Sequence, residues 1–279
     1  MKKYAVVEIK GGLGNQIFQY SFGCHLEKKG FKVLYNLEFY MKDFKSNTER
    51  EFLLDELDFE LKRVGKVFQR FINFLNFLVN SKKLKPLVPF LKSNLFKYFK
   101  ERDFQQNIDF HKYPIFNYFD GYWQNNESYL LAHKDRIYSS LKVNGNAPRL
   151  EKIMIHVRRD DYLDLGVELP IEYYKNALEV LEKKIGEMDY DIFTDDFTWV
   201  DSQDLFKNSK NIYTNEDDTI TTFLNMMQYK HYIIANSTYS YLAAFFGEII
   251  GSEVLMPYRW NKNKSEDFLT TNHWTKVKF

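Results

Sequence analysis

Residues 156–162, with the sequence His-Val-Arg-Arg-Asp-Asp-Tyr, set two arginines and two aspartates directly after a short apolar segment. That segment has the composition of a buried strand, and in an open α/β sheet ligands collect at the carboxyl ends of the strands. Arg158 and Arg159 suit a diphosphate there, because a guanidinium group makes two parallel bonds and keeps its charge. Two interpretations stay open from these residues alone: a phosphate-binding site, and a surface ion pair with Asp160 or Asp161.

A glycine-rich turn follows another apolar segment near the N-terminus. Residues 4–9 predict a buried strand, residues 11–15 have the sequence Gly-Gly-Leu-Gly-Asn, and a helical pattern then runs to Gly30 before a second strand at 31–35. Glycines let backbone N–H groups approach a ligand near a helix N-terminus. Position 17 is Ile, so the dinucleotide motif G-x-G-x-x-G is incomplete, and the lysine of a phosphate-binding P-loop is absent. An NAD-binding Rossmann unit is therefore disfavoured.

The second half of the chain repeats a strand, a polar turn and a helical pattern three times. The turns are Arg-Arg-Asp-Asp after residues 153–157, Thr-Asp-Asp after 190–193, and Asn-Ser-Thr after 231–235. This alternation predicts a parallel α/β domain with its polar turns on one edge. Ser237 or Thr238 is suited to cap the helix that follows. That pair serves as a cap alone or, beside two arginines, as part of an anion site.

Composition sets the class of protein and its expected location. With 279 residues, 44% hydrophobic and 18% aromatic, the chain can bury one large core or two medium ones. The single cysteine, Cys24, excludes an internal disulfide and fits a reducing compartment. Glu8 interrupts the first apolar run too early for a signal peptide, and no run approaches the roughly 20 residues of a membrane span. We expect a cytoplasmic protein without a transmembrane anchor.

A linker and a basic segment divide the chain further. Residues 144–148, Asn-Gly-Asn-Ala-Pro, predict a boundary between domains at 1–145 and 146–279. Residues 62–102 hold eleven Lys and Arg and one acid, Glu101, and their apolar residues follow helical spacing. We expect a basic helical insertion at about 60–115. It either packs on the first domain with a solvated face or contacts an anionic membrane surface as a peripheral anchor.

Four segments together resemble glycosyltransferase family 11, the bacterial α-1,2-fucosyltransferases. They are GGLGNQIFQY at 11–20, HVRRDDY at 156–162, IFTDD at 192–196 and IIANSTYSYLAAFFG at 233–247. The resemblance implies a GT-B-type α/β fold, with two Rossmann-like domains facing a central cleft. It also implies inverting, metal-independent transfer of L-fucose from GDP-β-L-fucose to the 2-hydroxyl of a terminal β-galactoside. The first domain would be the acceptor side and the second would bind GDP-fucose.

The resemblance also implies roles for individual residues. Arg158 would hold the β-phosphate and His156 would contact the guanine or ribose, with Arg159 beside them. Asp195 and Asp196 would accept bonds from the guanine, and the hydroxyl or backbone N–H groups of Ser237 and Thr238 would bind phosphate oxygens. From the first domain the donor would be approached by three residues of the glycine turn, Gly12, Gly14 and Asn15. Neither a metal nor any other cofactor is expected.

The sequence departs from the family pattern in three places. Asp160 stands where the family usually has Gly, so either the backbone there differs or the side chain points to solvent. An acid usual near Thr222 is absent, and Tyr241-Leu242 replaces a more usual aromatic pair. Each departure puts one contact or packing detail of the family in doubt.

The identity of the general base stays open. Asp161 either accepts the proton of the acceptor hydroxyl or holds Arg158 in place, and Asp164 and Glu168 are further candidates. An oxocarbenium-like transition state would make a base dispensable.

Two other functions stay open beside fucosyl transfer. The sequence Asp-Tyr-Asp at 189–191 has the D-x-D form that holds a metal in GT-A transferases, although it comes before a strand rather than after one. One alternative is therefore a metal-dependent transferase that uses another sugar nucleotide. The other is a catalytically silent glycan-binding protein of the same fold. We expect GDP-fucose and a β-galactoside oligosaccharide as partners, in surface polysaccharide or oligosaccharide synthesis, and no nucleic acid.

Overall fold

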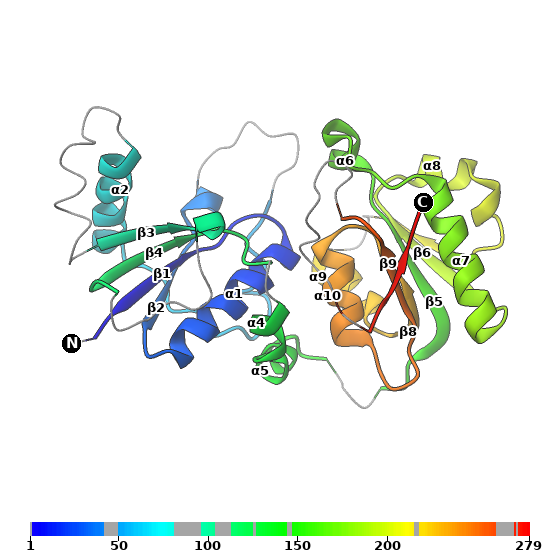
Figure 1. Ribbon diagram of the computed structural model, residues 1–279, viewed down its shortest axis with the longest axis horizontal. Helices are drawn as coiled ribbons and strands as arrows, with labels where there is room; N and C mark the ends of the chain where they lie inside the picture. The colour runs from blue at the N-terminus through cyan, green and yellow to red at the C-terminus, as the bar shows by residue number, and fades with distance from the viewer. Residues whose placement is uncertain are drawn as a thin grey trace. The chain divides into compact units, whose positions relative to one another are not determined.

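The structure, a computed structural model, divides into two compact units. It describes residues 2–41, 50–80, 96–103, 113–124, 127–143, 147–214, 218–260, 271 and 273–279. The units are Met1–Ser140 (unit 1) and Leu141–Phe279 (unit 2), and each is built around one parallel β-sheet (Figure 1). The division falls just before the linker predicted at 144–148, whose first three residues lie outside the described ones.

Unit 1 has a four-stranded sheet with the order β2-β1-β4-β3, in which every neighbouring pair is parallel. Its strands are β1 (Tyr4–Glu8), β2 (Lys32–Asn36), β3 (Phe96–Lys100) and β4 (Phe116–Asp120). Its helices are α1 (Leu13–Lys28), α2 (Lys66–Asn80), α4 (Glu127–Leu131) and α5 (Lys134–Ser140), with 3-10 turns η1 (Glu38–Met41) and η3 (Glu101–Asp103). The strand, glycine turn, helix and parallel strand predicted for residues 4–35 are confirmed.

The helix α2 packs on the sheet of unit 1. Ile72 of α2 is buried in one cluster with Val6 of β1 and Tyr118 of β4. Side chains alternate between the two faces of a strand, so Ala5 and Val7 point to the opposite face from Val6, and both are fully buried. The sheet is therefore covered on both faces.

The predicted basic helical insertion needs a correction. Its helix begins at Lys66 rather than near residue 61, and Phe96–Lys100 forms the edge strand β3, so the helical prediction is wrong there. The aromatic side chains of that segment favour a strand, where Phe96 and Phe99 pack into the core. The Lys-rich stretch at 81–95, like 104–112, lies outside the described residues.

Unit 2 has a six-stranded parallel sheet with the order β10-β9-β8-β5-β6-β7. Its strands are β5 (Leu150–Val157), β6 (Tyr190–Thr194), β7 (Asn211–Tyr213), β8 (Tyr229–Ile233), β9 (Val254–Pro257) and β10 (Thr275–Val277). Its helices are α6 (Asp160–Leu165), α7 (Ile171–Ile185), α8 (Phe197–Ser202), α9 (Thr219–Met226) and α10 (Thr238–Gly247), with a 3-10 turn η5 (Asp204–Phe206). The three predicted strand-turn-helix repeats are confirmed, and the fold is of the α/β class.

Each sheet has one topological switch point, at which the strands stop being added on one side of the first strand and continue on its other side. In unit 2, β6 and β7 lie on one side of β5 and β8 to β10 lie on the other, so the switch point falls between β5 and β8. In unit 1, β2 lies on one side of β1 and β4 and β3 lie on the other, so it falls between β1 and β4. Ligands of open α/β sheets bind outside the carboxyl ends of the strands at such switch points. None of the described helices is long and apolar enough to cross a membrane.

Candidate active site

The three polar turns of unit 2 meet at one edge of its sheet. They follow β8, β5 and β6, which are adjacent and parallel. The register places His156 opposite Phe193 and Val157 opposite Thr194, so the arginines leave β5 at the level where the aspartates leave β6. The turn after β8 closes the other side of the switch point. The order of the strands in the sheet therefore brings the three turns together.

Arg158 is held by two carboxylates. Its Nη2 donates to Oδ1 of Asp161 at 2.6 Å, and its Nη1 lies 2.8 Å from Oδ2 of Asp195. The side chain is 17% exposed and packs over the ring of Tyr162. Burial opposes the charge on Arg158, but Asp195 and Asp161 outweigh that effect and raise its pKa above the usual value. The guanidinium group is thus charged, oriented and still partly open to solvent.

Asp195 is the buried member of this arrangement, with 2% of its side chain exposed. Its Oδ1 accepts the backbone N–H of Arg159 at 2.8 Å, and its contact with Arg158 is ionic because Oδ2 accepts no hydrogen bond from the described residues. Burial raises the pKa of Asp195, and the charge of Arg158 opposes that shift. Asp195 therefore positions both arginines, through the guanidinium group of Arg158 and the backbone N–H of Arg159.

Arg159 contacts the turn after β6 and the first turn of α8 rather than Asp161. Its Nε donates to Oδ2 of Asp196 at 3.0 Å, and its guanidinium group lies 4.1 Å from the centre of the Trp199 ring. The second oxygen of Asp196 accepts the backbone N–H of Trp199 at 2.9 Å and caps α8. The structure thus gives both aspartates of this turn arginine and backbone partners. Their predicted contacts with guanine stay predictions.

The helix α10 presents its N-terminus to the same edge. Ser237 is its N-cap and accepts the backbone N–H of Tyr239 at 3.4 Å, which confirms the predicted cap, and Thr238 begins the helix. The turn is fixed by Asn236, whose carbonyl accepts the hydroxyl of Tyr162 at 3.2 Å and whose Nδ2 donates to the carbonyl of Val167 at 2.8 Å. A helix N-terminus carries partial positive charge, so it complements Arg158 as an anion site.

His156 is a buried neutral base at the end of β5. Burial, reinforced by the charge of Arg158, lowers its pKa to about 3. Its Nδ1 has no hydrogen-bond partner among the described residues, and its ring centre lies 6.1 Å from that of Tyr239. The imidazole is therefore uncharged at neutral pH. The predicted contact with guanine or ribose stays a prediction.

The glycine turn lies in unit 1, where Gly12 is the N-cap of α1 and Gly14 is buried in its first turn. The amide of Gln16 shapes this loop by donating to the carbonyls of Gly11 and Glu51. The side-chain oxygen of Asn15 accepts the amide of Gln124 at 2.7 Å. The expected approach of Gly12, Gly14 and Asn15 to a donor stays a prediction.

Two of the three departures from the family pattern have local explanations. Asp160 begins α6 and is exposed, where a negative charge suits the helix N-terminus. Tyr241 is fully buried, and its hydroxyl is 2.8 Å from that of Thr271. Thr222 is half-buried in α9, and the described residues offer no explanation for the missing acid at that position.

The Asp-Tyr-Asp segment lies away from the polar edge. Asp191 is buried inside β6, where its carboxylate accepts bonds from Lys152 at 3.0 Å and from the hydroxyl of Tyr229 at 2.7 Å. Its oxygens are therefore committed to the sheet. No group of three or more His, Cys, Asp or Glu side chains suited to a metal occurs among the described residues.

Two sets of residues at these edges were not predicted from the sequence. Tyr162 and Trp199 carry the arginines on their rings. In unit 1, Glu8 and Asp120 stand at the carboxyl ends of β1 and β4 on the two sides of its switch point. The signal in the sequence was an acid at the last position of each apolar strand. Only the strand order of the sheet shows that these two acids are neighbours.

Comparison with known proteins identifies the family of this chain. The family model described as glycosyl transferase family 11 matches residues 5–277. The chain belongs to glycosyltransferase family 11. It is 26% identical to the O-antigen biosynthesis glycosyltransferase WbnK of Escherichia coli, covering 96% of this chain and 99% of that protein. It is also 26% identical to an alpha-1,2-colitosyltransferase of Escherichia coli, covering 91% of each chain.

A solved structure extends the comparison of this family 11 glycosyltransferase to its fold. A mutant of the Arabidopsis thaliana protein FUT1 in complex with GDP superposes with a TM-score of 0.50 at 12% identity, covering 99% of this chain and 74% of that one. The predicted GT-B-type fold, with two Rossmann-like α/β domains, is confirmed. In this family 11 protein, each of the two domains has polar side chains at the carboxyl edge of its sheet.

Proposed function

We propose that this protein is a galactoside α-1,2-fucosyltransferase. It transfers L-fucose from GDP-β-L-fucose to the 2-hydroxyl of a terminal β-galactoside, with inversion and without a metal. The observation that carries the proposal is the guanidinium group of Arg158, fixed by Asp161 and Asp195 at the switch point of unit 2 beside the N-terminus of α10. Family membership supports it at the level of glycosyl transfer.

The chemistry requires positive charge at the leaving group. The acceptor oxygen attacks the anomeric carbon of fucose, and the bond from that carbon to the β-phosphate oxygen breaks with its electron pair left on GDP. Charge that develops on the diphosphate meets Arg158 and the N–H groups that open α10. Preorganised stabilisation of this kind is usually the largest single contribution to catalysis. The carboxylates of Asp161 and Asp195 keep the guanidinium group oriented before the donor arrives.

A second candidate donor sugar is colitose, because one relative is an alpha-1,2-colitosyltransferase at the same identity as the O-antigen transferase. Colitose is the 3-deoxy analogue of fucose, so both sugars present the same leaving group to Arg158. Discrimination would rest on a bond to the 3-hydroxyl. The name of the O-antigen biosynthesis relative also supports a role in surface polysaccharide synthesis, in which we propose GDP-fucose as the donor and a glycan as the acceptor.

The proposed location is cytoplasmic, with peripheral contact to the inner face of the membrane through residues 62–102. Support comes from α2, where Val67, Phe74 and Phe77 are 84%, 57% and 64% exposed next to the cations Lys66 and Arg70. Apolar side chains flanked by cations suit an anionic lipid surface.

Flotation with anionic liposomes tests this contact. We expect wild type to co-float and the double variant Phe74→Ser, Phe77→Ser to stay in solution. If wild type fails to co-float, the exposed face of α2 is only a solvated face.

Donor and product analysis tests the transfer reaction. Wild type is incubated in EDTA with GDP-fucose or GDP-colitose and a panel of β-galactosides, and the product linkage is determined by NMR. The expected product is an α-fucoside at the galactose 2-hydroxyl. Faster transfer from GDP-colitose would select the second candidate. Activity that requires a divalent metal would favour the metal-dependent alternative, and glycan binding without GDP affinity would favour the silent one.

A further inference from the structure

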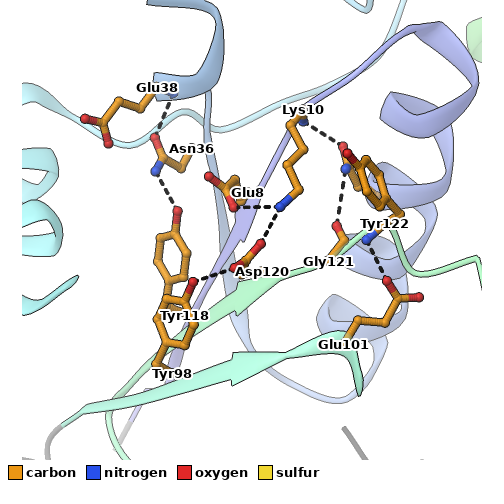
Figure 2. Close-up of polar contacts among 11 residues, drawn as sticks. Glu8, Lys10, Asn36, Glu38, Tyr98, Glu101, Tyr118, Asp120, Gly121 and Tyr122 are labelled. Carbon is orange, nitrogen blue, oxygen red and sulfur yellow. Dashed lines mark hydrogen bonds and ion pairs between the residues drawn. The ribbon is translucent and has the colours of Figure 1, made fainter. Parts of the chain in front are cut away.

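A second polar cluster lies at the switch point of unit 1. Glu8 ends β1 and Asp120 ends β4, and these strands are adjacent and parallel. Lys10, two residues beyond β1, reaches between the two acids (Figure 2). Tyr122, two residues beyond β4, has its ring centre 5.3 Å from Nζ of Lys10. We call these four residues the unit 1 edge, and they lie where an open α/β sheet binds its ligand.

The polar groups of the unit 1 edge orient one another. Nζ of Lys10 donates to Oε2 of Glu8 at 3.3 Å and also forms a short ion pair with Oδ1 of Asp120. The hydroxyl of Tyr98, on β3, donates to the second oxygen of Asp120 at 2.5 Å. The side chains of Glu8, Lys10 and Asp120 are 23%, 19% and 19% exposed. These groups are therefore fixed and still reachable by a ligand.

The unit 1 edge keeps hydrogen-bonding capacity for such a ligand. The contacts with Glu8 and Asp120 use two of the three N–H donors of Lys10. Burial alone would raise the pKa of Asp120, but its bonds from Lys10 and Tyr98 outweigh that effect and lower the pKa. Burial raises the pKa of Glu8 to about 7, an effect that Lys10 opposes and Asp120 reinforces. Near neutral pH the edge thus offers an ionised acceptor at Asp120 and a charged donor at Lys10.

The loop after β4 presents the ring of Tyr122 to solvent. Tyr122 is 42% exposed, whereas the next residue, Trp123, is buried and stacks on Phe22 with 3.8 Å between ring centres. Trp123 has a φ of +59°, a conformation that bulky residues rarely adopt, and its packing in the core holds it there. Glu101 accepts the backbone N–H of Tyr122 at 2.7 Å (Figure 2) and that of Gln124 at 3.0 Å. The exposed ring is therefore held from the backbone on both sides of Trp123.

Gln19 of α1 ties the two ends of the unit 1 edge together. Its Oε1 accepts the backbone N–H of Lys10 at 2.9 Å, and its amide donates to the carbonyl of Gly121 at 3.2 Å. A Cβ atom at Gly121 would lie 2.5 Å from Cβ of Glu101, so only glycine allows the approach of that acid to the loop. Lys10 and the ring beside it are thus kept in one arrangement before a ligand binds.

The chemistry of the unit 1 edge suits an uncharged sugar better than a phosphate. Its two carboxyl groups disfavour a diphosphate, whereas the arginines of unit 2 favour one. Sugar hydroxyls donate and accept hydrogen bonds, so they match a carboxylate and an ammonium group that lie side by side. In a galactose ring the axial 4-hydroxyl leaves C–H groups on the opposite face. Such an apolar face packs on an exposed aromatic ring.

We propose that the unit 1 edge binds the galactose ring of the acceptor glycan, with Tyr122 against its apolar face and with Asp120 and Lys10 bonded to its hydroxyls. The inference rests on the proposed function, which makes the glycan a β-galactoside. The binding is non-covalent and all of these groups belong to unit 1, so it requires no donor. Tyr122 is then a residue that determines acceptor specificity.

Galactoside binding by the full chain without GDP tests the aromatic part of this surface. Binding of lactose is measured by saturation-transfer NMR and calorimetry. Tyr122→Ala should weaken it roughly three- to tenfold through loss of the packed ring, and Tyr122→Phe, which keeps the ring, should bind like wild type. The control is Tyr258→Ala, at a tyrosine of unit 2 that is 41% exposed and has Lys278 at 5.1 Å from its ring centre. This control should match wild type.

The same assay tests the polar part of the surface. Asp120→Asn keeps the shape of the side chain but removes its charge, so lactose binding should weaken roughly tenfold. Asp204→Asn makes the same change at an exposed acid that pairs with Lys207, and it should bind like wild type. Calorimetry with GDP alone should give the wild-type affinity for Asp120→Asn and for Tyr122→Ala, because neither residue belongs to the proposed donor site.

Kinetics separate sugar binding from a structural effect. Tyr122→Ala should raise the KM of the galactoside by the factor seen in binding, with kcat near the wild-type value. Wild-type galactoside affinity in Tyr122→Ala, or in a folded Asp120→Asn protein, would overturn the inference and leave the proposed function standing. A wild type that binds lactose through Tyr122 but transfers no sugar would instead overturn the proposed function and leave the unit 1 edge as a glycan-binding surface.

Discussion

Asp195 places one carboxylate oxygen 2.8 Å from Nη1 of Arg158, while its other oxygen accepts the backbone N–H of Arg159. The carboxylate is 2% exposed, whereas the guanidinium group above it is 17% exposed. The buried acid therefore supports the more exposed arginine, which we propose as the phosphate-binding group. A pre-oriented cation loses less freedom when an anion binds than a flexible one would.

Asp195→Asn should weaken GDP binding by roughly tenfold, or about 1.4 kcal/mol. The amide can still accept the backbone N–H but gives Arg158 no counter-charge, and the buried site should lose about 1–3 kcal/mol of unfolding free energy. Calorimetry with GDP and denaturant unfolding measure the two effects. Asp204→Asn, at an exposed acid that pairs with Lys207, is the control. Unchanged GDP affinity in Asp195→Asn would show that Asp195 does not orient Arg158.

Asp161→Asn distinguishes the two roles left open for Asp161 by the sequence. Its ion pair with Arg158 at 2.6 Å leads us to expect a positioning role, with donor KM raised several-fold and kcat within about tenfold of wild type. Steady-state kinetics at several pH values make the comparison. A general base at Asp161 would instead cost on the order of 10²–10⁴ in kcat and remove a limb of the pH profile.

Glu8 should also make the stability of the fold depend on pH. Its pKa is about 7 in the folded protein and near 4.5 in the unfolded chain, so the folded state keeps a proton that the unfolded state releases between these values. Stability contributed by Glu8 is thus fully present below about pH 4.5 and is lost as the pH rises through about 7. The loss is on the order of 1–3 kcal/mol.

Urea unfolding of wild type and Glu8→Gln at pH 5 and pH 8 measures this effect. The wild type should lose stability relative to Glu8→Gln at the higher pH, because Gln cannot ionise. A difference between the two proteins that is the same at both pH values would refute the raised pKa of Glu8.

Much of the fold follows from local sequence patterns. The strands that end at Val157 and Thr194 and the helix capped by Ser237 were predictable because apolar periodicity and capping residues act over a few positions. The edge strand Phe96–Lys100 was not, because its apolar and basic residues also fit a helix. Pairing with β4, which no local pattern encodes, decides its conformation.

The candidate site divides in the same way. Arg158 could be singled out from sequence as a candidate, because two arginines after a buried strand are compatible with a phosphate-binding edge as well as with the ion pair to Asp161 that the structure has. Its partner Asp195 could be placed beside it only once β5 and β6 were known to pair. Lys10 and Asp120 are 110 positions apart, so their contact depends on the strand order of unit 1. Ion-pair partners follow from topology, which single residues do not reveal.

The proposed donor site at Arg158 is tested most directly by GDP release from GDP-fucose with β-galactosides in EDTA. Wild type is compared with Arg158→Ala and with Arg63→Ala, whose arginine forms an exposed ion pair with Asp55 in unit 1. We predict metal-free turnover by wild type, a loss on the order of 10²–10³ in kcat for Arg158→Ala, and no change for Arg63→Ala. No turnover on a panel of galactosides, or an Arg158→Ala protein as active as wild type, would contradict the proposed reaction.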